Sequence, residues 1–213
     1  MSHPNAVVRT VYTLLLWFAV MTVLAVQGVF TRGPGSTPLP LLLSLLVPLA
    51  AFALDRRSGG TLFGGLFGAP AAALALMQTW RVGGLVFLIE WGHGHLPGAF
   101  AWPAGVGDML IGVTAPVVAL LAAKGTLPRR WFALWNVLGI LDLVVAVFEG
   151  VSHSAGPAGF LRGAISTDAM GTYPLSVVPT FLVPLAVIIH LQALFPAVAT
   201  ERAAGWQPAR EAA

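Results

Sequence analysis

The sequence has 213 residues, of which 57% are hydrophobic and only 9% are charged. A soluble domain carries charges at about a quarter of its positions, so this chain has too few to cover a surface in water, and the composition predicts an integral membrane protein. The pI of about 10.2 comes from 11 Lys and Arg, ten of them at the ends of apolar segments and none in a basic patch with aromatic residues, which argues against a nucleic-acid partner. The absence of cysteine excludes disulfides, thiolate metal sites and iron–sulfur clusters.

Apolar segments long enough to cross a bilayer follow one another along the chain. About 20 apolar residues span the hydrocarbon core as a helix. On that basis we expect an all-α bundle of six transmembrane helices in a single membrane domain over residues 1–213. The expected spans are 7–30, 38–54, 70–92, 104–124, 130–152 and 174–195, with a cytoplasmic tail over 196–213.

The third span is the least regular of the six. Apolar sequence runs from Thr61 to Gly92 with Arg81 inside it, so a division at Arg81 would give seven spans. The few loop residues that a helical hairpin needs are missing there, which favours one helix starting at Pro70. Residues 61–68 then form a short interfacial or re-entrant piece. Prolines are expected to kink two later spans, at Pro116, Pro179 and Pro184.

The basic residues predict the orientation of the bundle. Two of them, Arg32 and Arg162, fall on one side of the predicted membrane and eight fall on the other. The eight are Arg9, Arg56, Arg57, Lys124, Arg129, Arg130, Arg202 and Arg210. The positive-inside rule therefore places both termini in the cytoplasm, as an even number of spans requires. Because Ala, Gly, Pro and Arg usage is of a bacterial kind, we expect a multi-pass protein of the bacterial inner membrane.

Two charged residues are predicted near the membrane midplane. Arg81 lies eleven residues into the third span and Asp142 twelve residues into the fifth, and both spans run outward. A charge in the hydrocarbon core costs at least about 2.5–3.5 kcal/mol. An ion pair between the two would offset the desolvation of each, either as a structural pair that fixes helix register or as part of a ligand site.

Acids and histidines gather near the predicted outer ends of spans three to five. The candidate catalytic residues, an anionic core at one depth, are Glu90, Asp108 and Glu149. The candidate metal ligands are His93, His95 and His153. Further candidate ligand-binding residues are Trp91, Trp102, Arg81 and Asp142. Glu90 and His93 are three residues apart, so they share a helix face. Glu149 and His153, four apart, do so as well.

The geometry of a straight helix speaks against one pocket for all of these groups. Arg81 and Glu90 are nine residues apart, so on a helix of about 100° per residue they point in opposite directions. Either Gly83–Gly84 distorts the helix, or the two residues have different neighbours.

Several classes of function fit the acids and histidines. Carboxylate and imidazole ligands suit zinc, iron or manganese, which predicts a periplasm-facing pocket for a divalent transition metal or a small polar ligand, including a membrane-embedded metal-dependent enzyme. The same groups fit a small proton-coupled transporter or receptor. A b-type haem would require two imidazoles that face each other. A structural subunit with hydrated histidines is the remaining alternative. The expected partners are the lipid bilayer and a small molecule or ion, while the oligomeric state is left open.

Two other segments bear on the site. The connection 153–173, which carries Arg162 and Asp168, could fold over the cluster as a lid. His190 lies on the cytoplasmic half of the sixth span, and a single histidine there is expected to pack between helices with one hydrogen bond to a neighbour.

Overall fold

The computed structural model describes residues 4–31 and 37–205, and these residues form helices, turns and loops without a strand. The predicted all-α architecture is confirmed, and six helical stretches in the described part are long and apolar enough to cross a membrane. They are Asn5–Val26, Leu39–Ser58, Ala71–Gly92, Gly98–Ala123, Arg129–Ser152 and Val178–Phe195. Arg32, Arg210 and residues 206–213 of the predicted tail lie outside the described residues.

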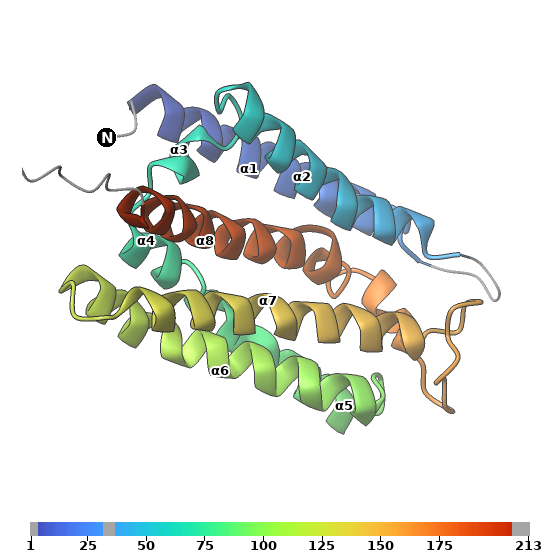
Figure 1. The fold of residues 1–213 in the computed structure, drawn as a ribbon. Coiled ribbons are helices and arrows are strands. Elements are labelled where there is room, and N and C mark those ends of the chain that lie inside the picture. The colour runs from blue at the N-terminus through green and yellow to red at the C-terminus, as the bar shows by residue number, and fades with distance from the viewer. Residues whose placement is uncertain (1–3, 32–36, 206–213) are drawn as a thin grey trace, which may run out of the picture.

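The helical elements follow one another with short connections, except before α2 and η2 (Figure 1). In chain order they are α1 (Pro4–Val26), α2 (Leu39–Ser58), α3 (Gly64–Phe67), α4 (Ala71–Leu76), η1 (Thr79–Gly84), α5 (Leu85–Gly92), α6 (Gly98–Ala123), α7 (Arg129–Ser152), η2 (Thr167–Gly171), η3 (Val178–Leu182) and α8 (Val183–Gly205).

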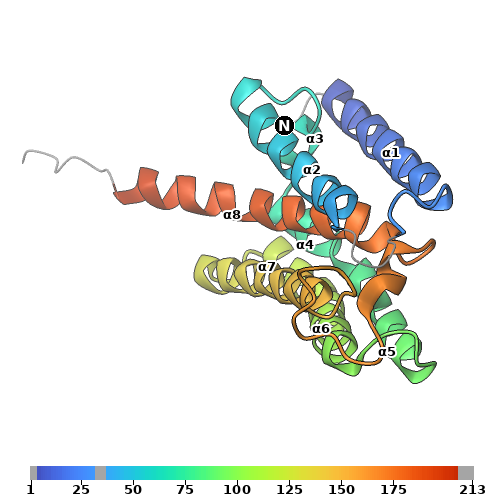
Figure 2. The same cartoon turned by 90° about the vertical axis from the view of Figure 1, so that its right-hand side faces the viewer.

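Helix α8 lies between two groups of helices (Figures 1 and 2). On one side it packs against α2, and on the other against α4 and α7, while α6 packs against α4, η1, α5 and α7. Helix α1 is more peripheral and packs mainly on α3 and η3. One apolar core cluster includes Phe52, Phe132 and Ile188, and another includes Phe87 and Leu96.

The two ends of the bundle differ in their charged groups. The N-terminus, the α2–α4 connection and the α6–α7 turn lie at one end (Figure 1). We call it the arginine end, for Arg56, Arg57, Arg129 and Arg130. The α5–α6 turn and the long α7–α8 connection lie at the opposite end. We call it the histidine end, for His93, His95 and His153.

The third span is a broken helix. Its middle is the 3-10 segment η1, which contains Arg81 and both glycines of the Gly83–Gly84 pair. The amide N–H of Arg81 accordingly donates to the carbonyl of Gln78, three residues earlier (3.1 Å). The distortion expected at Gly83–Gly84 is therefore present.

Two helices are longer than the sequence predicts. Helix α6 begins at Gly98 and not at residue 104, because the carbonyl of Pro97 accepts hydrogen bonds from the N–H groups of Phe100 and Ala101 at 3.1 and 2.9 Å. Helix α8 continues beyond residue 195 to Gly205. It follows the π-helical turn η3, so the distortion predicted for this span is present at Pro179, whereas Pro184 lies in the first turn of α8.

The short piece between α2 and α4 is fixed at the arginine end by Asp55. Its carboxylate accepts hydrogen bonds from three successive backbone N–H groups, those of residues 61–63, at 2.7–3.0 Å. The hydroxyl of Thr10 in α1 donates to the carbonyl of Leu62 (2.9 Å). These bonds satisfy buried backbone groups at a helix end and connect α1 to the rest of the bundle.

Candidate functional site

A network of polar side chains surrounds Arg81, which is fully buried near the middle of the third span. The guanidinium Nε donates to Asp108 Oδ1 of α6 (2.7 Å), and Nη2 donates to Asp142 Oδ2 of α7. Nη1 donates to the carbonyl of Gly139 (3.3 Å) and contacts Nε2 of His190 in α8 (3.1 Å). One cation therefore joins the third span to α6, α7 and α8, and the Arg81–Asp142 pair expected from equal depths is among these contacts.

His190 takes part in this network as a neutral imidazole. The guanidinium of Arg81 has only donors, so Nε2 of His190 accepts and Nδ1 carries the proton. Nδ1 then donates to Oδ1 of Asn136 (2.8 Å), whose Nδ2 donates to the carbonyl of Phe132 (2.8 Å). The orientation of each side chain is thus determined by the next one.

The network holds more negative than positive charge when both carboxyls are ionised. Arg81 supplies one positive charge, Asp108 and Asp142 each supply one negative charge, and His190 is neutral. The net charge of −1 lies in a part of the bundle where an uncompensated charge is costly. A proton or a cationic group of a ligand would bring it to zero.

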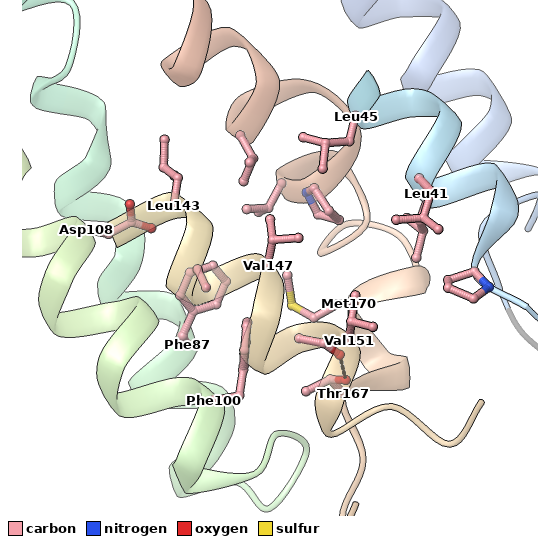
Figure 3. Close-up of a pocket in the computed structure, with 17 residues that line it drawn as sticks. Leu41, Leu45, Phe87, Phe100, Asp108, Leu143, Val147, Val151, Thr167 and Met170 are labelled. Atoms are coloured by element: carbon pink, nitrogen blue, oxygen red, sulfur yellow. Dashed lines mark hydrogen bonds between the residues drawn. The ribbon is translucent and has the colours of Figure 1, made fainter. Parts of the chain in front are cut away.

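An apolar cavity of about 90 Å³ leads from this network toward the histidine end (Figure 3). Its walls come from α2, α5, α6, α7, η2 and η3, and include Leu45, Phe87, Phe100, Leu143, Val147 and Met170. Among the described residues that line it, Asp108 is the only charged one. Figure 3 shows Asp108 at one side of the group, opposite Leu41 and Leu45 of α2.

Asp108 is the acidic residue of this lining. Its Oδ1 is bound by Arg81, whereas no hydrogen bond from the described residues reaches Oδ2. Helix α6 approaches the third span closely here: a Cβ at Gly84 would meet the Asp108 side chain and the carbonyl of Gly105. Oδ2 lies 3.3 Å from the position that this Cβ would take, and it keeps its capacity as an acceptor.

The connection between α7 and η3 covers the cavity at the histidine end. Thr167 and Met170 of η2 belong to the lining. The connection is fixed to the end of α7, since the Thr167 N–H donates to the carbonyl of His153 (3.1 Å) and the Leu161 N–H to that of Ser152 (2.9 Å). The segment considered as a lid for the acid–histidine cluster thus contributes Thr167 and Met170 to the apolar cavity.

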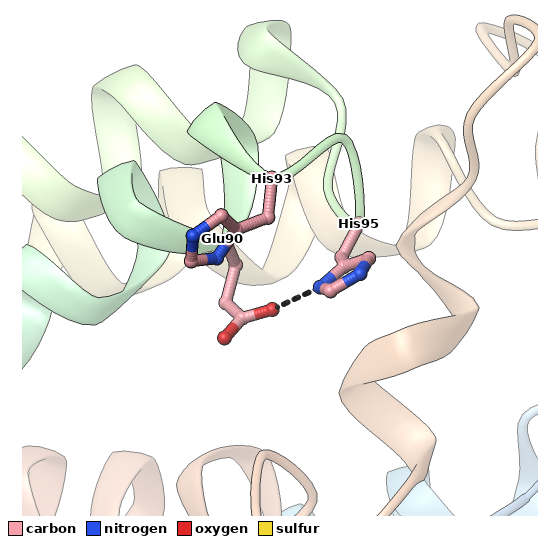
Figure 4. A group of neighbouring side chains, drawn as sticks. All are labelled: Glu90, His93 and His95. Atoms are coloured by element: carbon pink, nitrogen blue, oxygen red, sulfur yellow. Dashed lines mark hydrogen bonds and ion pairs between the residues drawn. The ribbon is translucent and has the colours of Figure 1, made fainter.

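Glu90, His93 and His95 form a separate group at the histidine end (Figure 4). His95 Nδ1 lies 2.7 Å from Glu90 Oε2, and one ligand atom from each of the three residues lies within 4.8 Å of the others. Glu149 and His153 form a local pair on α7, with Oε2 and Nδ1 3.2 Å apart. Within the described residues, His153 does not belong to the three-residue group.

A protein family with the description "Domain of unknown function (DUF8737)" matches residues 68–197. The chain belongs to this family. Neither the curated proteins nor the solved structures include a match to the chain. The DUF8737 range contains the whole Arg81 network and both acid–histidine groups, whereas α2, which supplies one wall of the cavity, precedes it.

The residues that the sequence singled out in the DUF8737 range divide into three places. Asp108 joins Arg81 and Asp142, Glu90 joins His93 and His95, and Glu149 joins His153. Within the described part of the chain, no residue bridges these three carboxylates. The structure therefore does not gather them into one acid–histidine pocket. Trp91 and Trp102 stack edge to face on α5 and α6 with centroids 5.3 Å apart, and both are exposed rather than part of the cavity.

Two network residues were not among the sequence-predicted site residues, His190 and Asn136. Depth could have indicated them, because Asn136 lies six residues after Arg130 at the start of its predicted span and His190 lies five before Phe195 at the end of its own. Both ends are on the same predicted side, so the two residues are expected at nearly one level.

Proposed function

We propose that this DUF8737 protein is an integral protein of the bacterial inner membrane, with both termini in the cytoplasm, that binds a small amphiphile. In this proposal the ligand places an apolar body in the cavity and a cationic, hydrogen-bond-donating head group against Asp108. The observation that carries the proposal is Asp108, the one charged side chain among the described residues of this apolar lining, whose Oδ2 accepts no hydrogen bond from them.

Membrane insertion is supported by the apolar exterior of the six long helices. Leu, Val and Phe side chains on α1, α6 and α7 are widely exposed, among them Leu16, Leu110, Val113, Val144 and Phe148. Contiguous apolar surface of this extent is a liability in water and is favourable in lipid. The charged residues at both ends of the bundle support the same arrangement.

The head group follows from charge. A cation on Asp108 Oδ2 would bring the network of Arg81, Asp108 and Asp142 to zero net charge. An anion would add to the negative charge of the network. Hydrogen bonds between ionised partners are about twice as strong as neutral ones, so an amine is favoured over an alcohol. A cavity of about 90 Å³ is smaller than the ~150 Å³ that holds a benzene ring, so it encloses only a few methylene groups next to the head group, and the end of a longer chain would extend beyond it.

This geometry favours the transporter or receptor class over the other classes considered. A binding site with a charge-compensated acid near the middle of the bundle fits a carrier or sensor of amphiphilic cations, and the second carboxyl, Asp142, offers a place for a coupled proton. The b-type haem alternative gains no support, because His93 and His95 are grouped with Glu90 while His153 is paired with Glu149.

The proposal is tested by head-group preference at constant chain length. Full-length protein in lipid nanodiscs is dialysed to equilibrium against radiolabelled n-hexylamine, n-hexanol or n-hexanoate, with empty nanodiscs subtracted. We expect the amine to bind most tightly and the acid least. Asp108→Asn should weaken the amine at least about tenfold and leave the acid unaffected or improved, since a charge-assisted bond contributes about 1.5–3 kcal/mol.

Two further variants make the result specific to the cavity. Ala146 lines the cavity and has no part in the hydrogen bonds of the network, so Ala146→Phe should abolish binding of all three compounds. Glu149→Gln changes an acid outside the cavity and should leave binding within twofold of the unmodified chain. Equal binding of amine and acid, or an equal loss in Glu149→Gln and Asp108→Asn, would overturn the proposal.

A further inference from the structure

We propose a second site, independent of the cavity: Glu90, His93 and His95 bind one divalent transition-metal ion at the histidine end. The three side chains come from six consecutive residues, at the end of α5 and in the connection to α6 (Figure 4). Their ligand atoms are all within 4.8 Å of one another, a separation from which small side-chain rotations bring them onto one ion.

The backbone brings these three side chains together. The N–H of His95 donates to the carbonyl of Glu90 (2.9 Å) and the N–H of Gly94 to that of Trp91 (2.9 Å). Gly94 has φ +76°, so the helix ends in a Schellman motif with Gly94 in the left-handed conformation. That motif folds the residue after the glycine back over the last turn, where an apolar contact is usual; here the two positions hold His95 and Glu90.

The chain beyond the turn is fixed as well. Leu96, directly after His95, is fully buried in the cluster of Phe87 and Phe100. Pro97 then precedes α6 as its N-cap residue. Because both sides of the turn are packed, the ligands are arranged before an ion arrives, which reduces the entropy lost on binding.

The donor set is one carboxylate and two imidazoles. This combination suits zinc, iron(II) or manganese and leaves coordination positions open for water or a further ligand. An ion can enter from solvent, because the His95 side chain is 62% exposed and that of Glu90 23%. The existing contact between Glu90 and His95 shows that acid and imidazole already face each other.

The experiment uses the full-length protein in detergent without a histidine tag, titrated with Co²⁺ and then with Zn²⁺. Co²⁺ binding is followed by its visible ligand-field bands, and Zn²⁺ by displacement of Co²⁺ and by calorimetry. We expect one equivalent of metal per chain. Glu90→Gln and His95→Ala should each weaken binding at least tenfold, and the double variant His93→Ala/His95→Ala should remove the bands.

His153→Ala is the matched control, since His153 is also an imidazole beside a glutamate at the same end of the bundle. It should keep binding within twofold of the unmodified chain. If His153→Ala weakens binding as much as His95→Ala, or if Glu90→Gln has no effect, the assignment of this site is wrong. Hexylamine binding of every variant checks folding separately, so loss of the metal site and loss of the cavity are distinguishable.

Discussion

At the residue scale, Arg81 is the centre of the described molecule's buried polar contacts. It binds Asp108, Asp142 and the Gly139 carbonyl and fixes the ring of His190. A buried ion pair contributes little net stability compared with apolar packing, but removal of one partner leaves the other charge buried and uncompensated. Replacement of Arg81 should therefore lower the free energy of unfolding much more than replacement of either acid.

Arg81→Gln and Asp142→Asn are predicted to have unequal effects on stability. Loss of the guanidinium leaves two buried carboxyls and an unsatisfied His190, so the free energy of unfolding should fall by about 3–5 kcal/mol. Asp142→Asn keeps an acceptor oxygen for Arg81 and brings the network to zero net charge, so its cost should be less than half as large. Unfolding in mixed micelles, titrated with a denaturing detergent, measures both.

The control for this comparison is Arg57→Gln, at an exposed position in the last turn of α2. It should change the free energy of unfolding by no more than about 0.5 kcal/mol. Equal losses for Arg81→Gln and Asp142→Asn would show that the charge count of the network does not govern its stability.

The sequence predicts the Arg81–Asp142 pair of this network but places Asp108 too close to the end of its helix. Counting residues from span ends gave equal depths for Arg81 and Asp142, and the pair is present. Asp108 was assigned to the outer level because its helix was expected to start at residue 104; the start at Gly98 moves it about 9 Å further from the helix end, at 1.5 Å per residue. Residues 93–103 are rich in Gly and Pro, which is typical of a loop, and this composition concealed the start of α6.

At the element scale, the approach of η1 to α6 decides where Arg81 lies. Gly112 of α6 faces the backbone of η1, and a Cβ there would come within 2.8 Å of the carbonyl carbon of Arg81. Backbone atoms cannot rotate away as a side chain can. The glycine pair Gly83–Gly84 allowed a distorted helix to be anticipated, but a single sequence does not show which residue of α6 it contacts.

Gly112→Ala and Gly83→Ala form a matched pair of substitutions for this contact. Gly112→Ala should destabilise the protein by about 1–3 kcal/mol or more, because the added methyl overpacks a close helix contact. Gly83→Ala, in the same 3-10 segment but with nothing within 4 Å of the added Cβ, should be neutral or up to about 1 kcal/mol stabilising. Thermal unfolding of the detergent-solubilised variants gives both values, and similar values for the two would contradict the close packing of η1 on α6.

At the scale of the whole molecule, length and hydropathy were enough to predict six spans, whereas helix packing was not predictable. The position of α8 between α2 and the α4–α7 group depends on side-chain fit that no periodicity reveals. The same holds for α1, which packs mainly on α3 and η3, with Trp17 and Phe181 in edge-to-face contact at 4.7 Å. The cavity is a product of that packing, because α2, outside the DUF8737 range, supplies one of its walls.

The orientation of the bundle is predicted by its charges and can be tested directly, because the chain has no cysteine. Single cysteines are placed at exposed positions at the two ends: Ala164→Cys at the histidine end, and Thr126→Cys and Ser58→Cys at the arginine end. In intact bacterial cells a membrane-impermeant maleimide should label Ala164→Cys alone, and the other two only after the membrane is permeabilised. Basic residues are retained on the cytoplasmic side, so the opposite pattern would reverse the proposed topology, and labelling of all three in intact cells would contradict a bundle that crosses the membrane.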